Sequence, residues 1–102
     1  MAFRLQAPET FPADVRFACI DGEERVLHVG FKWLTRDEFV AYCKDGKDKS
    51  DPQFFAGLVN SWDGDEPCNE DGLAKLFGYH KNAARALFER YQRELMEVEE
   101  KN

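Results

Sequence analysis

Residues 15–33, VRFACIDGEERVLHVGFKW, decide the fold, because two runs of alternating apolar and polar residues flank a turn in this stretch. The first run places Val15, Phe17 and Cys19 on one side of an extended chain. The second run, Leu27 to Trp33, alternates in the same way. Two alternating runs joined by a short polar segment predict an antiparallel β-hairpin.

The length of the turn decides whether the two apolar faces meet. A two-residue loop at Asp21-Gly22 would pair Phe17 with Val26 and place the apolar residues of the two strands on opposite sides of the sheet. We therefore predict an odd-numbered loop or a bulge near Gly22 to Glu24, which brings both apolar faces together.

The pattern becomes helical from Thr35 onward. Thr35-Arg36-Asp37-Glu38 has the form of a capping box and predicts a helix start, and Gly46 predicts the end of that helix. Asp51 as N-cap, followed by Pro52, predicts a second helix that carries apolar residues as far as Trp62.

Two further helices are expected in the remaining part of the chain. Asn69 predicts the cap of a short third helix that ends at Gly78. The stripe from Ala84 to Leu95 predicts a long fourth helix.

The expected fold class is α+β, with an N-terminal antiparallel β-hairpin or small sheet packed with about four helices. The 102 residues are expected to form a single domain. Its parts are residues 1–13 as a loose arm or, over Phe3 to Ala7, an edge strand, 15–34 as the hairpin, 35–95 as the helical part and 96–102 as a fraying acidic tail.

The composition limits the classes of function. Twenty Asp and Glu residues against fourteen Lys and Arg residues give a formal charge of −6, which disfavours general attraction to nucleic acid or anionic lipid. No apolar run approaches about 20 residues, the length that crosses a bilayer. The N-terminal stretch also lacks the apolar run of a signal peptide. We therefore expect a cytoplasmic protein without membrane contact.

Residues that carry common enzyme chemistry are sparse. The chain has no Gly-x-Ser-x-Gly elbow and no Walker-type loop, and its cysteines do not cluster with His28 or His80. We expect reduced thiols, with Cys19 and Cys43 in the core and Cys68 in a polar loop. No catalytic residue, metal, cofactor or small-molecule substrate is expected.

Aromatic side chains are more numerous than a small sheet and short helices need, although most are expected in the core. Phe54 and Phe55 are adjacent and, with Leu58, Val59 and Trp62, would form a broad apolar arc on one helix. An uncovered apolar arc rimmed by acidic residues is typical of a protein that holds a hydrophobic helix of another chain.

Residues 70–90 also have a spacing typical of a helix-turn-helix, with a small residue, a glycine four positions later and apolar residues on both sides. In a DNA-binding regulator, Lys81, Asn82 and Arg85 would contact the groove or the phosphates. Acidic residues in the same segment oppose phosphate binding, and an αα-hairpin that only completes a core has the same spacing. Partner binding and DNA binding both stay open at this point.

Four stretches follow one another in a recognisable order. They are Phe31–Phe39 at a strand-to-helix junction, Leu58–Trp62 at a helix end, Asn69–Phe77 after an acidic loop, and Ala86–Tyr91 in the closing helix. In this order and spacing, residues 15–95 resemble the small tail assembly chaperones of bacteriophages and prophages.

This resemblance implies a non-catalytic function in the bacterial host cytoplasm. Such a chaperone transiently binds hydrophobic helical segments of the tape-measure protein until tail-tube subunits assemble around it, so the implied partners are the tape-measure protein and, secondarily, the tail-tube protein. The side chains expected to contact the partner are large and apolar. They are Phe54, Phe55, Leu58 and Trp62, with Trp33 and Tyr91 at the flanks.

Overall fold

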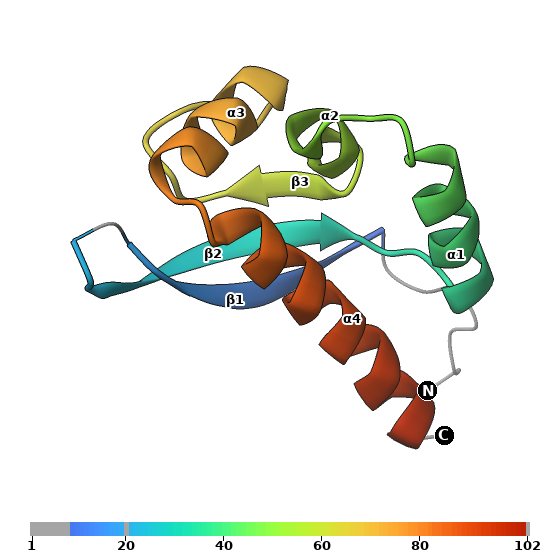
Figure 1. Ribbon diagram of the computed structural model, residues 1–102. Helices are drawn as coiled ribbons and strands as arrows, with labels where there is room; N and C mark the ends of the chain where they lie inside the picture. Colours follow the sequence, from blue (N-terminus) through green and yellow to red (C-terminus); the bar gives the residue numbers. More distant parts are fainter. Residues whose placement is uncertain (1–8, 20, 102) are drawn as a thin grey trace.

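A computed structural model of the chain describes residues 9–19 and 21–101, with side chains as far as Leu95. These residues form three strands and four helices (Figure 1). The elements are β1 (Thr10–Ala18), β2 (Glu24–Lys32), α1 (Arg36–Asp45), α2 (Asp51–Ala56), β3 (Val59–Trp62), α3 (Glu70–Tyr79) and α4 (Ala83–Lys101). The predicted α+β fold class is confirmed.

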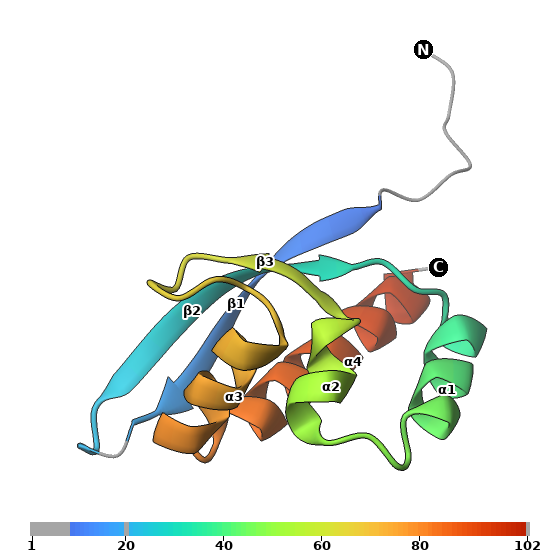
Figure 2. The ribbon, with the colours of Figure 1, turned by 90° about the horizontal axis from the view of Figure 1, so that it is seen from above.

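The three strands form an antiparallel sheet in the order β1-β2-β3. All four helices lie on one side of this sheet (Figure 2). Along β1, buried and exposed residues alternate strictly, and the buried residues face the helices. The described residues on the opposite face of β1 are exposed to solvent, as is usual for an antiparallel sheet that packs on one side only.

The hairpin register agrees with the prediction. Val15 lies opposite Leu27 and Phe11 lies opposite Phe31, so the apolar residues of β1 and β2 share one face. Residues 19–23 separate the two strands. This connection has an odd number of residues, as predicted from the need to bring both apolar faces together.

The first strand begins earlier in the chain than expected. Residues 10–13, predicted as part of a loose arm, belong to β1. Pro12 is accommodated because β1 is an edge strand, where a residue without an N–H group is tolerated. The edge strand predicted over Phe3 to Ala7 lies outside the described residues.

Side-chain caps begin the first three helices. The Thr35 hydroxyl accepts from the Glu38 N–H at 3.2 Å, and the Glu38 carboxylate accepts from the Thr35 N–H at 2.9 Å, which confirms the predicted capping box. Gly46 caps the end of α1, and Asn69 caps the start of α3, as predicted. The cap of α2 is Ser50 rather than the predicted Asp51, because Asp51 is already the first helical residue.

The second helix is shorter than predicted. It ends at Ala56 with Gly57 as its C-cap, and residues 59–62 form β3 instead of continuing the helix. Val59 lies opposite Phe31 and Trp62 lies opposite Val29 in β2. The open edge of β2 needs backbone partners, and β3 supplies them, so tertiary pairing overrides the helical spacing of the apolar residues.

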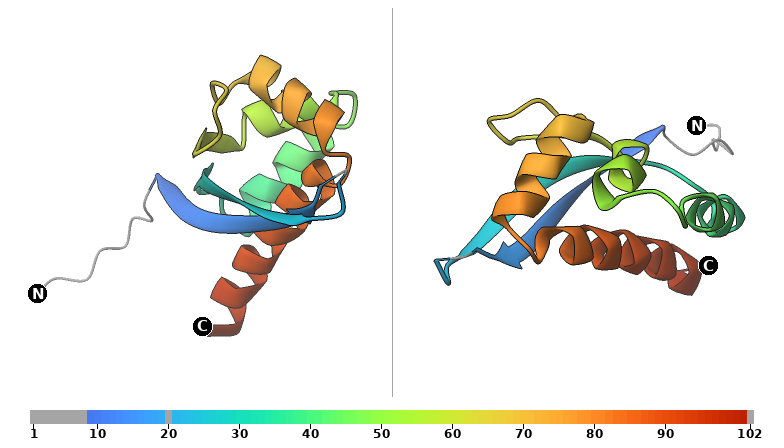
Figure 3. Two further views of the ribbon diagram at one scale, coloured as in Figure 1. Left: turned by 90° about the vertical axis from the view of Figure 1, so that its left-hand side faces the viewer. Right: turned by 45° about the horizontal axis from the view of Figure 1, so that its top comes forward.

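The long helix α4 packs against β1 and runs along the row formed by α3, α2 and α1 (Figure 3). Leu87 and Tyr91 of its predicted apolar stripe are completely buried. The ring of Tyr91 stacks on Phe39 with centroids 5.0 Å apart and meets Phe31 edge-on at 5.1 Å. α3 ends at Tyr79 rather than at the predicted Gly78. Residues 96–101, predicted as part of a fraying acidic tail, continue α4 as far as Lys101.

The hydroxyl of Tyr91 binds two backbone groups at the junction between β2 and α1. It donates to the Lys32 carbonyl at 2.8 Å and accepts from the Leu34 N–H at 3.1 Å. Burial raises the pKa of Tyr91 to about 12, so the hydroxyl keeps its proton at neutral pH. These two bonds fix α4 to the segment through which the chain leaves the sheet.

A three-residue polar cluster lies on the open face of the sheet. The Nδ1 atom of His28 is 2.6 Å from Asp14 Oδ1, and its Nε2 atom is 4.0 Å from Asp63 Oδ2. The Asp63 carboxylate also accepts from the His28 N–H at 3.0 Å. The hydrogen bond and charge of Asp14 raise the pKa of His28 above its ordinary value, with a further contribution from Asp63.

We expect Tyr91→Phe to lower the free energy of unfolding by about 1–3 kcal/mol, because the Lys32 carbonyl and the Leu34 N–H lose their partner. Urea denaturation followed by circular dichroism measures this loss. Tyr79→Phe is the matched control, since Tyr79 is 71% exposed, and it should change the value by no more than about 0.5 kcal/mol. Equal stabilities for Tyr91→Phe and the wild type would show that the two hydrogen bonds of the Tyr91 hydroxyl do not stabilise the fold.

We also expect the His28 cluster to make stability depend on pH. The pKa of His28 is about 6.5 in the unfolded chain and higher in the folded one. Its contribution is therefore complete below about pH 6.5 and is lost as the pH rises through the folded pKa. Urea midpoints of the wild type and His28→Gln, measured between about pH 6 and about pH 9, should converge with rising pH. A constant difference would show that the charged imidazole contributes nothing.

Candidate functional site

The six residues predicted to contact a partner are not on one surface. Phe55 is 3% exposed, and Leu58 and Tyr91 are fully buried. Phe55 and Leu58, predicted on a broad uncovered arc, and Tyr91, predicted at its flank, are core residues, so the prediction that they contact a partner is wrong. The physical reason is that α2 ends at Ala56, after which the chain turns into the sheet and buries Leu58.

The other three predicted residues are half-buried and lie apart from one another. Trp33 meets the core ring of Phe11 edge-on at 5.4 Å. Phe54 and Trp62 line two different hollows of the surface. The structure therefore offers two separate apolar surfaces in place of the predicted single arc.

The larger hollow, here named the Phe54–Phe88 groove, lies between the α1–α2 loop, α2 and α4 and has a volume of about 590 Å³. Its apolar wall is formed by Phe54, Phe55, Ala84 and Phe88. The rings of Phe54 and Phe88 are half-buried, with centroids 6.2 Å apart. Part of each ring is therefore left for contact with another molecule.

Neighbouring side chains hold the two rings in place. Tyr42 meets Phe54 edge-on at 4.9 Å and donates its hydroxyl proton to the Phe54 carbonyl. Burial raises the pKa of Tyr42, which keeps this donor protonated. Phe88 packs against the buried ring of Phe39 at 5.8 Å. Because both rings are supported from below, the groove is preorganised, and binding costs little side-chain entropy.

Charged residues surround the Phe54–Phe88 groove. Lys47, Lys49 and Arg85 are on its rim together with Asp51 and Glu89. The guanidinium of Arg85 is paired with Glu89 at 2.8 Å. The rim thus has a small excess of positive charge around an apolar floor.

The residues of the alternative DNA-binding hypothesis are exposed but do not form a basic surface. Lys81 and Asn82 lie in the turn between α3 and α4, and Arg85 lies in the first turn of α4. The charge of Arg85 is balanced by Glu89. The opposite face of α4 packs against the sheet, where Leu87 and Tyr91 are buried.

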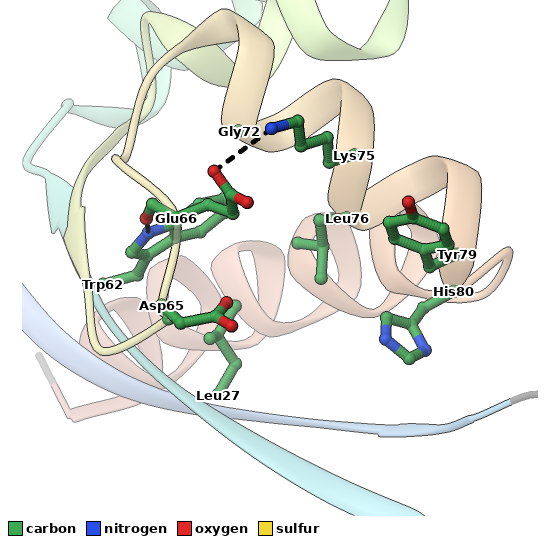
Figure 4. A pocket seen from close by; sticks show the side chains of 10 residues that line it. Leu27, Trp62, Asp65, Glu66, Gly72, Lys75, Leu76, Tyr79 and His80 are labelled. Atoms are coloured by element: carbon green, nitrogen blue, oxygen red, sulfur yellow. Dashed lines mark hydrogen bonds and ion pairs between the residues drawn. The ribbon is translucent and has the colours of Figure 1, made fainter.

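The second hollow, here named the Trp62 groove, has a volume of about 290 Å³ and lies between the β3–α3 loop and α3. Figure 4 shows Trp62 and Leu76 on opposite sides of the hollow, with Leu27 below them and Tyr79 and His80 at the far end of α3. Asp65, Glu66 and Lys75 provide the charged groups around it.

Sequence reasoning did not assign Phe88, Ala84, Leu76 or Tyr79 to a binding surface. The sequence shows the helical stripe through Ala84 and Phe88. It does not show which residues of the stripe are buried and which stay exposed, because that depends on how α4 lies on the sheet. The sheet covers Leu87, which is fully buried, and leaves Phe88 half-exposed to the groove.

The three cysteines lie at partly or fully buried positions. Cys19 is buried as predicted, and Cys43 and Cys68 are half-buried. Burial raises the pKa of Cys43 and of Cys68, which lowers the thiolate fraction at neutral pH. Among the side chains of residues 9–19 and 21–95, no group of three or more His, Cys, Asp or Glu could hold a metal ion.

Comparison with known proteins places the chain in a family. No helix among the described residues has both the length and the apolar character to cross a membrane. No curated protein and no solved structure matches the chain. The family model of phage tail assembly chaperones matches residues 1–102, which is the whole sequence given. This agrees with the resemblance seen in residues 15–95, and the chain belongs to the phage tail assembly chaperone family.

Proposed function

We propose that the protein binds hydrophobic helical segments of the tape-measure protein in the host cytoplasm, and that the Phe54–Phe88 groove is the contact surface. Membership of the tail assembly chaperone family supports a role in tail assembly. The observation that carries the choice of surface is the pair of half-buried rings between α2 and α4. We propose a binding function without catalysis.

The shape of the groove suits an amphipathic helix. Helix recognition commonly places apolar side chains from successive turns into a hydrophobic groove between helices. Ala84, one turn before Phe88 on α4, leaves room in the wall of the groove because its side chain is a single methyl group. An apolar side chain of the partner would pack against both rings, and its burial would contribute about 1.5–3 kcal/mol.

The charges of the protein fit the same function. The formal charge of −6 favours dispersal of a protein that presents apolar surface. The groove accepts few side chains, which favours modest affinity and ready release. A chaperone that later yields its partner to tail-tube subunits needs such reversible binding.

We expect Ala84→Glu to weaken binding of a tape-measure fragment at least about tenfold, because the carboxylate enters the apolar wall of the groove. Glutamate is favourable in the first turn of a helix, so the fold should persist. Isothermal titration calorimetry on the purified protein and a fragment found by co-expression measures the change.

The matched control is Ala74→Glu, since Ala74 is exposed on α3 and lines neither groove. It should bind like the wild type. Binding should also persist at high salt, because apolar contacts are not screened as ion pairs are. Unchanged binding by a folded Ala84→Glu variant would reject this surface.

A further inference from the structure

The Trp62 groove is independent of the Phe54–Phe88 groove. The two hollows share none of their lining residues. The Trp62 groove combines an apolar interior with acidic groups, and the family assignment gives it no role. These features indicate a second binding site, which prefers a different kind of segment from the Phe54–Phe88 groove.

The indole of Trp62 is held rigidly. Its Nε1–H donates to the Glu66 carbonyl at 2.7 Å. Gly72 of α3 lies close to both the ring and the β3–α3 loop. A Cβ atom at Gly72 would lie 2.0 Å from the Pro67 carbonyl oxygen and 3.0 Å from the Trp62 ring. Only glycine fits there, so the ring has a fixed position before any ligand arrives. Fixed aromatic rings are the side chains that most often dominate binding energies.

Three further apolar side chains complete the interior. Leu76 lies across from Trp62, Leu27 forms the floor, and Tyr79 lies at the end of α3 (Figure 4). Tyr79 is 71% exposed and is the most exposed large apolar side chain among the described residues. The Nδ1 atom of His80, another lining residue, is buried and has no hydrogen-bond partner among the described residues.

The charged groups around the Trp62 groove leave an excess of negative charge. Glu66 pairs with Lys75 at 3.2 Å. Asp65, which also lines the hollow, has no ion-pair partner in the part of the chain that the structure describes. A cationic group of an occupant could therefore pair with Asp65 while its apolar neighbour enters the hollow.

We propose that the Trp62 groove binds a polypeptide segment of a partner protein that presents one large apolar side chain next to a lysine or arginine. The apolar side chain packs between Trp62 and Leu76, and the cation lies against Asp65. The rim of the Phe54–Phe88 groove has the opposite excess of charge, because Lys47, Lys49 and Arg85 there face two acids. The two grooves thus select different segments, and this site does not depend on the function proposed above.

Tryptophan fluorescence tests the proposal directly. The chain has two tryptophans, so Trp33→Phe leaves Trp62 as the single reporter. Three synthetic helical peptides with the same leucine stripe are titrated, and their flanking positions carry lysine, glutamine or glutamate. We expect the lysine peptide to shift the Trp62 emission and to bind at least about tenfold more tightly than the glutamate peptide. The glutamine peptide should lie between them.

Charge reversal identifies the cation-binding group. Asp65→Lys should remove most of the preference for the lysine peptide. Asp48→Lys, the matched control, changes the net charge equally at an exposed position that lines neither groove, and it should retain the preference. Added salt should weaken binding of the lysine peptide, because the ion pair is at the surface.

Two further measurements separate the proposal from its alternatives. Tyr79→Ser should lower the affinity for the lysine peptide by about threefold to tenfold. The protein should stay folded, because the ring of Tyr79 is largely exposed. Ala84→Glu should leave this binding unchanged, so failure of one groove does not imply failure of the other.

Three results with the peptides would overturn the proposal. They are equal binding of the lysine and glutamate peptides, full preference in Asp65→Lys, and a Trp62 emission that does not respond to peptide. A shift of Trp62 emission with protein concentration alone would identify a second copy of this chain as the occupant and would likewise reject the proposal.

Discussion

The phenol of Tyr91 joins the long helix to the point where the chain leaves the sheet. Just beyond the end of β2, the Trp33 N–H still bonds to the Glu9 carbonyl at 2.9 Å, but the Lys32 carbonyl and the Leu34 N–H need other partners, whose absence would be costly. The Tyr91 hydroxyl serves the Lys32 carbonyl and the Leu34 N–H at once, while its ring packs on Phe39 of α1. The direction of α1, and with it the α1–α2 loop beside the Phe54–Phe88 groove, therefore depends on this side chain.

The ring contacts that begin at Tyr91 continue to the surface. Tyr91 stacks on Phe39, Phe39 packs against Phe88, and Phe88 contacts Phe54 at the groove. The groove is thus the outer end of the aromatic core and not a separate patch. Close-packed rings resist displacement because few alternative arrangements fit. For that reason, the rings at the surface keep the positions that the interior gives them.

Local signals in the sequence predicted the elements whose causes are local. The Thr35–Glu38 capping box and the Asn69 cap depend on residues within one helical turn, and the hairpin register follows from alternation. β3 could not be predicted in this way, because Val59–Trp62 becomes a strand only when β2 is present beside it. The same cause explains why the binding residues were predicted wrongly. The predicted arc needs one continuous helix, and the chain instead turns into the sheet after Ala56. Half-burial of Phe88, likewise, is set by the sheet beneath α4.

Half-buried rings have a physical advantage over the fully exposed arc that the sequence suggested. An exposed patch several residues long would promote association of the protein with itself. Rings that are already partly covered expose less apolar surface to water. The same coverage limits the area that a partner can still bury, and the favourable free energy scales with that area. Binding through Phe54 and Phe88 should therefore be weak for each contact and additive over several segments. A partner held in this way can be released one segment at a time, which suits the proposed transfer to an assembling tail.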